Sequence, residues 1–237
     1  GIYSLASNYG SLIARILFQP IEESSRNLFS LLLSPSETRM RDQQTLGAAK
    51  SHLMDILRGY GILSALILPL GPALAPRMVH ILGGRRWTSP EVDSLLSLYC
   101  YYIPFLAFNG ITEAFVSSAA SPADLRRHAG WMGGFSACFA VAAYLFLKIG
   151  GLGASGLVCA SIVTMAVRLL WSYRFIRAYF RRYESELVLS DAGLRLATVA
   201  AGVAAASIMP AGQKYAASNI KSLLMALGFG AAYTLLV

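Results

Sequence analysis

Charged residues are scarce in this 237-residue chain, at 14% of the sequence, whereas a soluble domain carries about 25%. The mean hydropathy is +0.55, and 56% of the residues are hydrophobic. Several apolar runs reach the roughly 20 residues that a helix needs to cross the hydrocarbon core of a bilayer. The scarcity of charge therefore excludes an ordinary soluble domain and predicts an all-α, polytopic transmembrane helical bundle.

Cysteines and catalytic motifs are also few or absent. The three cysteines, Cys100, Cys138 and Cys159, lie far apart in apolar runs, so neither a disulfide framework nor a metal site is indicated. The sequence contains no HExxH, nucleophile elbow or phosphate-binding loop. We therefore expect no enzyme activity, catalytic residue, metal or cofactor. No initiating Met or signal peptide is visible, and we expect the C-terminal part of a longer protein.

The formal net charge of +8 does not point to nucleic acid in this context. A basic soluble domain would suggest such a partner, but here the arginines gather at the ends of apolar runs. At those positions they contact lipid headgroups and set the topology. We expect membrane lipids, and no nucleic acid, as partners.

The apolar runs predict seven spans with polar connections. These lie at residues 4–33, 55–78, 95–119, 130–149, 153–176, 191–209 and 217–237. Lys and Arg are more frequent in the first, third and fifth connections than in the other three. The positive-inside rule then places these connections and the C-terminus in the cytosol.

The first predicted span carries an unusual row of polar residues. Because they recur every three or four residues, they form one stripe on a helix. The stripe consists of Asn8, Ser11, Arg15, Gln19, Glu22 and Arg26, with Glu23 beside it. A charge near the bilayer centre costs roughly 2.5–3.5 kcal/mol, so such residues normally face a protein interior or a watery cavity. The stripe predicts a path or a pocket.

Arg15 lies near mid-depth of this span, about two helical turns from Glu22 and Glu23. That separation is too large for simple pairing on a straight helix, so its partner is another helix, an absent part of the chain or an anionic ligand. The planar guanidinium suits a phosphate. The alternative is a structural ion pair that locks two helices together.

The third predicted span offers a second polar set in the string LAFNGITEAF. Asn109 and Glu113 are four residues apart and share a face, with Thr112 beside them. One interpretation is a wall of the same cavity, which binds sugar hydroxyls or a proton. The other is an interhelical hydrogen bond, worth about 0.6 kcal/mol on average in membranes.

Prolines, glycines and aromatic residues give further expectations about packing. Prolines interrupt three of the spans, as happens where a helix lines a cavity or is buried in protein: Pro20, Pro69, Pro72, Pro76 and Pro104. Gly130 and Gly134 form a small-xxx-small pair that predicts close helix packing. His128, Trp131 and Trp171 lie near span ends, where we expect them at the level of the lipid headgroups.

Two strings resemble the motifs of a known family. GIYSLASNYGSLIARILFQPIEESSR, at residues 1–26, resembles the signature of the eukaryotic RFT family, and NGITEAF, at residues 109–115, is similar to a second motif. The helix order also fits, so the resemblance covers essentially the whole chain. It implies membership of the multidrug/oligosaccharidyl-lipid/polysaccharide exporter superfamily, with two helical lobes around a central cavity. Residues 1–237 would form a C-terminal lobe fragment of about seven helices, without the N-terminal lobe.

The resemblance also implies a function. The family is implicated in moving dolichol pyrophosphate-linked Man5GlcNAc2 across the endoplasmic reticulum membrane for protein N-glycosylation. The partners would be this dolichol-linked oligosaccharide and the missing N-terminal lobe. The resemblance and the polar stripe together predict a substrate path. Its lining residues would be Asn8, Arg15, Gln19, Glu22, Glu23, Arg26, Asn109 and Glu113. The alternatives are a non-transporting scaffold for oligosaccharide assembly and a cation-coupled small-molecule exporter, with Glu22, Glu23 or Glu113 as the coupling carboxylate.

Overall fold

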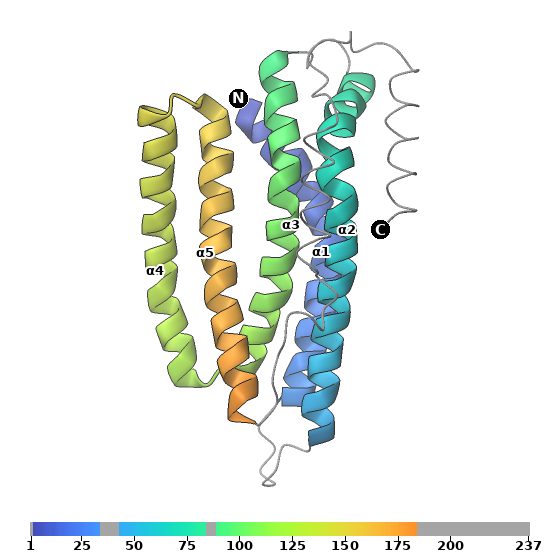
Figure 1. Ribbon diagram of the computed structural model, residues 1–237, viewed down its shortest axis with the longest axis vertical. Helices are drawn as coiled ribbons and strands as arrows, with labels where there is room; N and C mark the ends of the chain where they lie inside the picture. Colours follow the sequence, from blue (N-terminus) through green and yellow to red (C-terminus); the bar gives the residue numbers. More distant parts are fainter. Residues whose placement is uncertain (1, 34–42, 84–88, 184–237) are drawn as a thin grey trace.

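The chain folds as a bundle of long helices in the computed structural model (Figure 1). The structure describes residues 2–33, 43–83 and 89–183, except for the side chains of residues 2–11, 13–15, 77 and 80–83. In these ranges the elements are α1 (Ile2–Leu33), α2 (Gln43–Gly83), α3 (Pro90–Ala119), α4 (Pro122–Tyr144), a π-helical turn η2 (Leu145–Ile149) and α5 (Gly153–Arg182).

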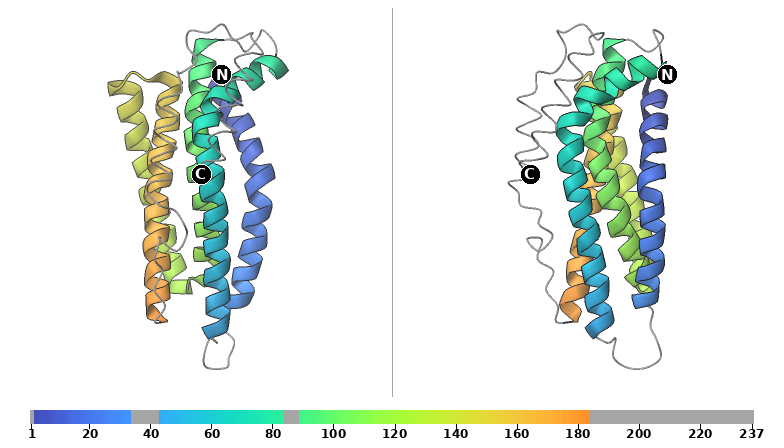
Figure 2. Two further views of the ribbon diagram at one scale, coloured as in Figure 1. Left: turned by 45° about the vertical axis from the view of Figure 1, so that its right-hand side comes forward. Right: turned by 90° about the vertical axis from the view of Figure 1, so that its right-hand side faces the viewer.

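The helices run alternately up and down, and α3 lies at the centre (Figures 1 and 2). It packs against α1, α2 and α5, whereas α4 packs against α5 and forms the outer edge of the described bundle. The end of α1, the start of α2, the junction of α3 with α4 and the end of α5 all lie at one end, the lower end in Figure 1. That this end faces the cytosol stays a prediction.

Four helical segments are long and apolar enough to cross a membrane, which confirms the predicted transmembrane bundle. They are Gln43–Pro76, Pro90–Ala119, Pro122–Ile149 and Gly153–Arg182. The segment α1 is not among them, because its polar stripe lowers its hydropathy. The helices α2 and α4 begin at Gln43 and Pro122, so the predicted starts at residues 55 and 130 were wrong and the connections before them are shorter than predicted. The predicted spans 191–209 and 217–237 lie outside the described residues.

Aromatic side chains fill the core between α1, α3 and α5. Phe115 of α3 is fully buried and contacts Phe29 of α1 at 5.1 Å and Phe180 of α5 at 5.4 Å between ring centroids. Tyr179 adds an edge-to-face contact at 5.5 Å. Such pairs contribute about 0.5–1.5 kcal/mol beyond the burial of area. This cluster therefore holds α1 and α3, which carry the predicted site, together with α5.

The prolines of α2 bend it, and α3 supplies a donor for one of the carbonyl groups that they leave without a backbone partner. Figure 2 shows the upper part of α2 leaving the axis of the lower part. Pro76 has no N–H, so it cannot donate to the carbonyl of Pro72 one turn earlier. The Ser97 hydroxyl of α3 donates to that carbonyl at 3.0 Å. A β-carbon on Gly71 would lie 2.9 Å from Cys100, so α2 and α3 approach closely here.

The glycines around α4 act differently from the prediction. A β-carbon on Gly130 would have no atom within 4 Å, and one on Gly134 would meet only the Trp131 ring of its own helix, at 3.7 Å. The prediction that another helix packs closely on this pair was therefore wrong for the described residues. Instead, Gly151 and Gly153 take φ angles of 60° and 54° in the turn into α5. These left-handed angles favour glycine, because a β-carbon would meet the carbonyl oxygen.

Candidate functional site

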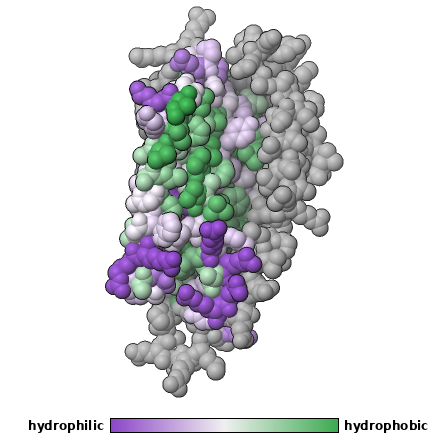
Figure 3. Space-filling view, turned by 60° about the vertical axis from the view of Figure 1, so that its left-hand side comes forward, coloured by the Kyte–Doolittle hydropathy of each residue, from purple (hydrophilic) through white to green (hydrophobic). Residues whose placement is uncertain are grey.

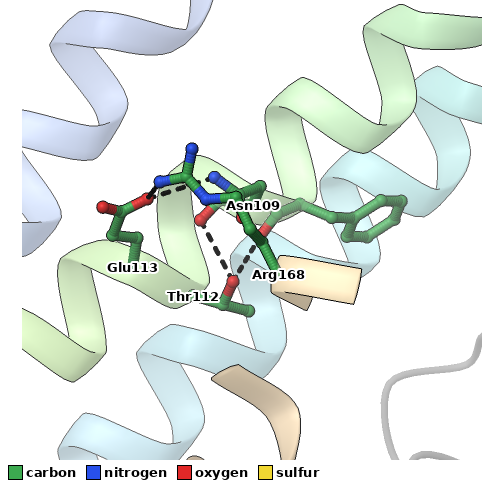
Figure 4. A network of polar contacts seen from close by, with 5 residues as sticks. Asn109, Thr112, Glu113 and Arg168 are labelled. Atoms are coloured by element: carbon green, nitrogen blue, oxygen red, sulfur yellow. Dashed lines mark hydrogen bonds and ion pairs between the residues drawn. The ribbon is translucent and has the colours of Figure 1, made fainter. Parts of the chain in front are cut away.

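The polar residues of α3 lie on its buried side and satisfy one another in part. Asn109 Nδ2 donates to Glu113 Oε2 at 3.1 Å, as the four-residue spacing predicts (Figure 4). The Thr112 hydroxyl donates to the carbonyl oxygens of Phe108 and Asn109, so it bonds within its own helix. Asn109 and Thr112 are buried, and Glu113 is half-buried. The set therefore faces neighbouring helices.

Glu113 forms an ion pair with an arginine from α5. Arg168 Nη2 donates to Glu113 Oε2 at 2.6 Å, and the two side chains are 22% and 29% exposed (Figure 4). Arg168 lies halfway along α5, in a segment apolar enough to span a membrane. A charge at such a depth needs a partner, because a low-dielectric surrounding penalises an uncompensated charge. The pair links α3 with α5 inside the bundle.

Glu22 brings α1 into the same region. Its half-buried carboxyl group occupies the space that a β-carbon on Gly110 would fill, so the glycine permits its approach to α3. The carboxylate of Glu22 is repelled by that of Glu113 across the helices and attracted by the guanidinium of Arg26 on its own helix. The structure therefore brings together Glu22, Asn109 and Glu113, which the sequence predicted as lining one path.

Two buried polar atoms near this region have no hydrogen-bond partner among the described residues. They are the Asn109 Oδ1 atom and the Tyr60 hydroxyl of α2. Tyr60 also lies within electrostatic reach of Glu22. Leaving a buried polar atom unsatisfied costs about 1–3 kcal/mol, so most such atoms are bonded to protein or ordered water. These two atoms have unused capacity for water or for the hydroxyl groups of a polar ligand.

The remaining members of the α1 stripe are placed less fully. Gln19 Nε2 donates to Glu23 Oε1 at 2.8 Å, and both residues are exposed, as is Arg26. They flank the side of α1 that packs on α3, and no described helix covers them. The side chains of Asn8 and Arg15 lie outside the described residues, so the inward orientation of Arg15 stays a prediction. No group of three metal-ligating side chains occurs in the described ranges.

His128 of α4 lies between the ion pair and the lower end of the bundle. Its ring stacks on Trp171 of α5 with centroids 4.5 Å apart and planes inclined by 27°. It is within electrostatic reach of both Glu113 and Arg168. His128 therefore lies close to the ion pair, on the side of α4 that faces α5.

The profile of the family described as Rft protein matches residues 1–237, the whole chain. The chain belongs to the Rft family. Among curated relatives it is 38% identical over 186 residues to a protein of Candida glabrata, covering 78% of this chain and 33% of the relative. It is 36% identical over 181 residues to a protein of Saccharomyces cerevisiae, covering 76% and 31%. A mouse protein is 32% identical over 204 residues, covering 86% and 37%.

Each of these relatives is named Man(5)GlcNAc(2)-PP-dolichol translocation protein RFT1. This Rft chain spans about a third of the length of the curated relatives it matches. No solved structure matches it. The family and the apolar helices together identify a multi-pass membrane protein.

Sequence reasoning missed Arg168 in this Rft chain, although a signal was present. Arg168 is the one charged residue in the predicted span 153–176 apart from Arg174 at its end. The rule that drew attention to Arg15, that a charge inside an apolar run needs a protein or water partner, applies to it equally. The partner, Glu113, lies 55 positions away in the sequence, and no local spacing could have paired the two.

Proposed function

We propose that this chain is the C-terminal lobe of a protein that moves dolichol pyrophosphate-linked Man5GlcNAc2 across the endoplasmic reticulum membrane for N-glycosylation. The observation that carries the proposal is the meeting of Glu22, Asn109, Glu113 and Arg168 inside a bundle of apolar helices. The names of the relatives supply the substrate. Membership of the two-lobed exporter superfamily is part of the proposal.

The chemistry of the substrate explains why such a lining is needed. A pyrophosphate and a glycan cannot cross hydrocarbon unaided, because their charges and hydroxyl groups would lose hydration without replacement. Guanidinium groups bind phosphate oxygens through a planar fork, and amides and carboxylates bind sugar hydroxyls. In this proposal Arg15 and Arg26 serve the phosphates, while Asn8, Gln19, Glu22, Glu23, Asn109 and Glu113 serve the glycan.

The second lobe would come from the rest of the full-length protein. The uncovered polar residues Gln19, Glu23 and Arg26 of α1 are then the surface that meets the N-terminal lobe across the cavity. Lobes that rock about a site at the middle of the membrane would expose it to each side in turn. The relatives are about three times as long as the matched segment, which leaves ample length for a further bundle.

The test is transport of the glycolipid by the full-length protein reconstituted into liposomes, with an assay that reports its leaflet. Glu22→Gln should lower the rate about 10- to 150-fold, because a hydrogen bond to a charged group contributes about 1.5–3 kcal/mol. Glu91→Gln, an exposed acidic residue in the first turn of α3, is the matched control and should leave the rate unchanged. A folded wild-type protein that does not accelerate transfer between leaflets would contradict the proposal.

A second candidate function, a non-transporting scaffold for oligosaccharide assembly, is favoured by one observation. Glu113 and Arg168 already neutralise each other, as the two members of a structural lock between helices would. The exchange Glu113→Arg with Arg168→Glu separates the two functions. Restored N-glycosylation in cells that depend on the exchanged protein would support the lock. Loss of N-glycosylation with normal folding would support contact with a ligand.

A further inference from the structure

A separate cavity lies at the lower end of the bundle between α4 and α5. It has a volume of about 290 Å³, just below the range of about 300–1,000 Å³ for ligand pockets. Arg127 of α4 and Arg174 and Arg182 of α5 line it. We call it the α4–α5 cavity. None of these residues belongs to the polar network around Glu113.

The three arginines converge because of helical spacing. Arg174 and Arg182 are eight residues apart and therefore share one face of α5, and Arg127 lies on the facing side of α4. No described acidic residue forms an ion pair with any of the three. The acidic residue at the cavity, Asp124, accepts hydrogen bonds from the Ser121 hydroxyl at 2.8 Å and from the Ser121 backbone N–H at 3.3 Å. Its carboxylate caps the start of α4. Because three arginines face this single carboxylate, the cavity has an excess of positive charge.

The other walls of the cavity are aromatic. Trp171, Phe175 and Tyr179 stack along α5 at successive turns, with centroids 5.9 and 6.4 Å apart. Trp131 of α4 stands opposite and is 45% exposed. Arginines at a helix C-terminus also complement the helix dipole, but that effect requires neither a cavity nor aromatic walls. Guanidinium forks framed by aromatic rings at a membrane interface suit a phosphate carried on an amphipathic molecule.

The two helices that form the cavity are largely uncovered in the described bundle. In the apolar segments of α4 and α5 that are suited to cross a membrane, only 17% of each is buried inside the structure. Figure 3 shows hydrophobic side chains over the middle of this face and hydrophilic ones at its lower end. A headgroup in the adjoining leaflet can therefore enter sideways while its chains remain against the apolar band. The volume accommodates a headgroup and not a whole oligosaccharide.

We propose that the α4–α5 cavity binds the phosphate group of a membrane lipid through Arg127, Arg174 and Arg182. The phosphate comes from one of two sources, a pyrophosphate-linked isoprenoid or an ordinary anionic phospholipid. The proposal goes beyond transport, since it concerns a lipid-facing site outside the polar network. Binding is measured without any transport, so failure here would leave the proposed function untouched.

The test measures binding to the purified full-length protein in detergent by titration calorimetry. The probes are farnesyl pyrophosphate, dioctanoyl phosphatidic acid and inorganic pyrophosphate. The triple variant Arg127→Gln, Arg174→Gln and Arg182→Gln should weaken lipid binding at least about tenfold, because three charge-assisted contacts are lost. The matched control is Arg126→Gln, Arg177→Gln and Arg181→Gln. It removes the same charge from neighbouring exposed positions that do not line the cavity and should change affinity by less than about twofold.

The outcomes separate the sources. If the wild-type protein binds farnesyl pyrophosphate more tightly than phosphatidic acid, the phosphate comes from an isoprenoid; the reverse order assigns a phospholipid. Either order supports the site if the cavity triple variant no longer binds the preferred lipid more tightly than the other lipid. Equal losses in the two triples would overturn the proposal in favour of diffuse surface attraction. Binding of inorganic pyrophosphate alone would overturn the lipid part. If the cavity triple variant does not fold, the single variants Arg174→Gln and Trp131→Leu are measured in its place, with Arg177→Gln as the control. Each should weaken lipid binding more than the control does, and losses equal to that of the control would overturn the proposal.

Discussion

Glu113 Oε2 accepts hydrogen bonds from two residues, Asn109 of its own helix and Arg168 of α5. The single oxygen thus joins an amide and a guanidinium inside the bundle. Removing one member of such a pair is more damaging than removing both, because the survivor keeps its charge without compensation.

The ion pair predicts a characteristic pattern of stabilities. Arg168→Gln and Glu113→Gln should each lower the free energy of unfolding by about 3–5 kcal/mol. The double variant should lose less than either single variant, which means a coupling energy of at least about 3 kcal/mol. Denaturant unfolding of the full-length protein in detergent measures all four corners of the cycle. Additive losses would mean that the two groups do not interact.

A substitution at Gly110 should displace the Glu22 carboxyl group with little effect on stability, unlike the substitutions at the ion pair. In Gly110→Ala the new β-carbon takes the place of the Glu22 carboxyl group, which moves easily because it ends a flexible side chain. We expect unfolding to change by less than about 1 kcal/mol, as for other small helical substitutions, and transport to fall as it does in Glu22→Gln. Gly59→Ala, in open space on α2, is the control for transport. If Gly110→Ala lowers transport further in a Glu22→Ala background, the steric explanation is wrong.

At the scale of elements, the bend in α2 depends on a partner in α3. The sequence predicted that prolines would interrupt this span, and the structure adds how the freed carbonyl is satisfied. That bond could not be predicted, because it joins residues 25 positions apart whose facing depends on how two helices pack. The apolar runs were sufficient to find α2, α3, α4 and α5, whereas the starts of α2 and α4 were missed because their first turns are polar.

Ser97→Ala should therefore lower stability by about 1–3 kcal/mol, since the Pro72 carbonyl then lacks a donor. Ser161→Ala is the matched control. Its hydroxyl donates at 2.9 Å to the Leu157 carbonyl on its own helix, and the backbone can satisfy that carbonyl. We expect a change of less than about 0.5 kcal/mol for the control in thermal or denaturant unfolding. Equal effects of the two substitutions would contradict the role of Ser97.

At the scale of the whole molecule, the described bundle has two unlike flanks. The outer surface of α4 is apolar, with Val141 60% exposed. The uncovered side of α1 is mixed, since it carries Gln19, Glu23 and Arg26 beside the apolar Ile16 and Leu31, which are 65% and 77% exposed. The sequence predicted the polar row of α1 and placed Glu22 on it, with Glu23 beside it. It could not predict that Glu22 packs against Gly110 while Gln19 and Arg26 of the same row stay exposed, because that depends on the register of α1 against α3.

These flanks predict different chemical environments in the full-length protein. A cysteine at position 19 (Gln19→Cys) should react with a charged, membrane-impermeant thiol reagent, because thiolate formation requires water. A cysteine at position 141 (Val141→Cys) should react at least about tenfold more slowly, since a thiol in apolar surroundings stays protonated. Labelling rates in a background without Cys100, Cys138 and Cys159 measure the contrast. Similar rates at the two positions would mean that α1 faces lipid.

The contact between Ser97 and the Pro72 carbonyl also has an evolutionary consequence. The hydroxyl is useful only while residue 76 is a proline, because any other residue there restores the backbone donor within α2. Conversely, a proline at 76 is tolerated best when a hydroxyl is present at 97. Lineages of this family should therefore gain and lose the two residues together, even though they lie on different helices.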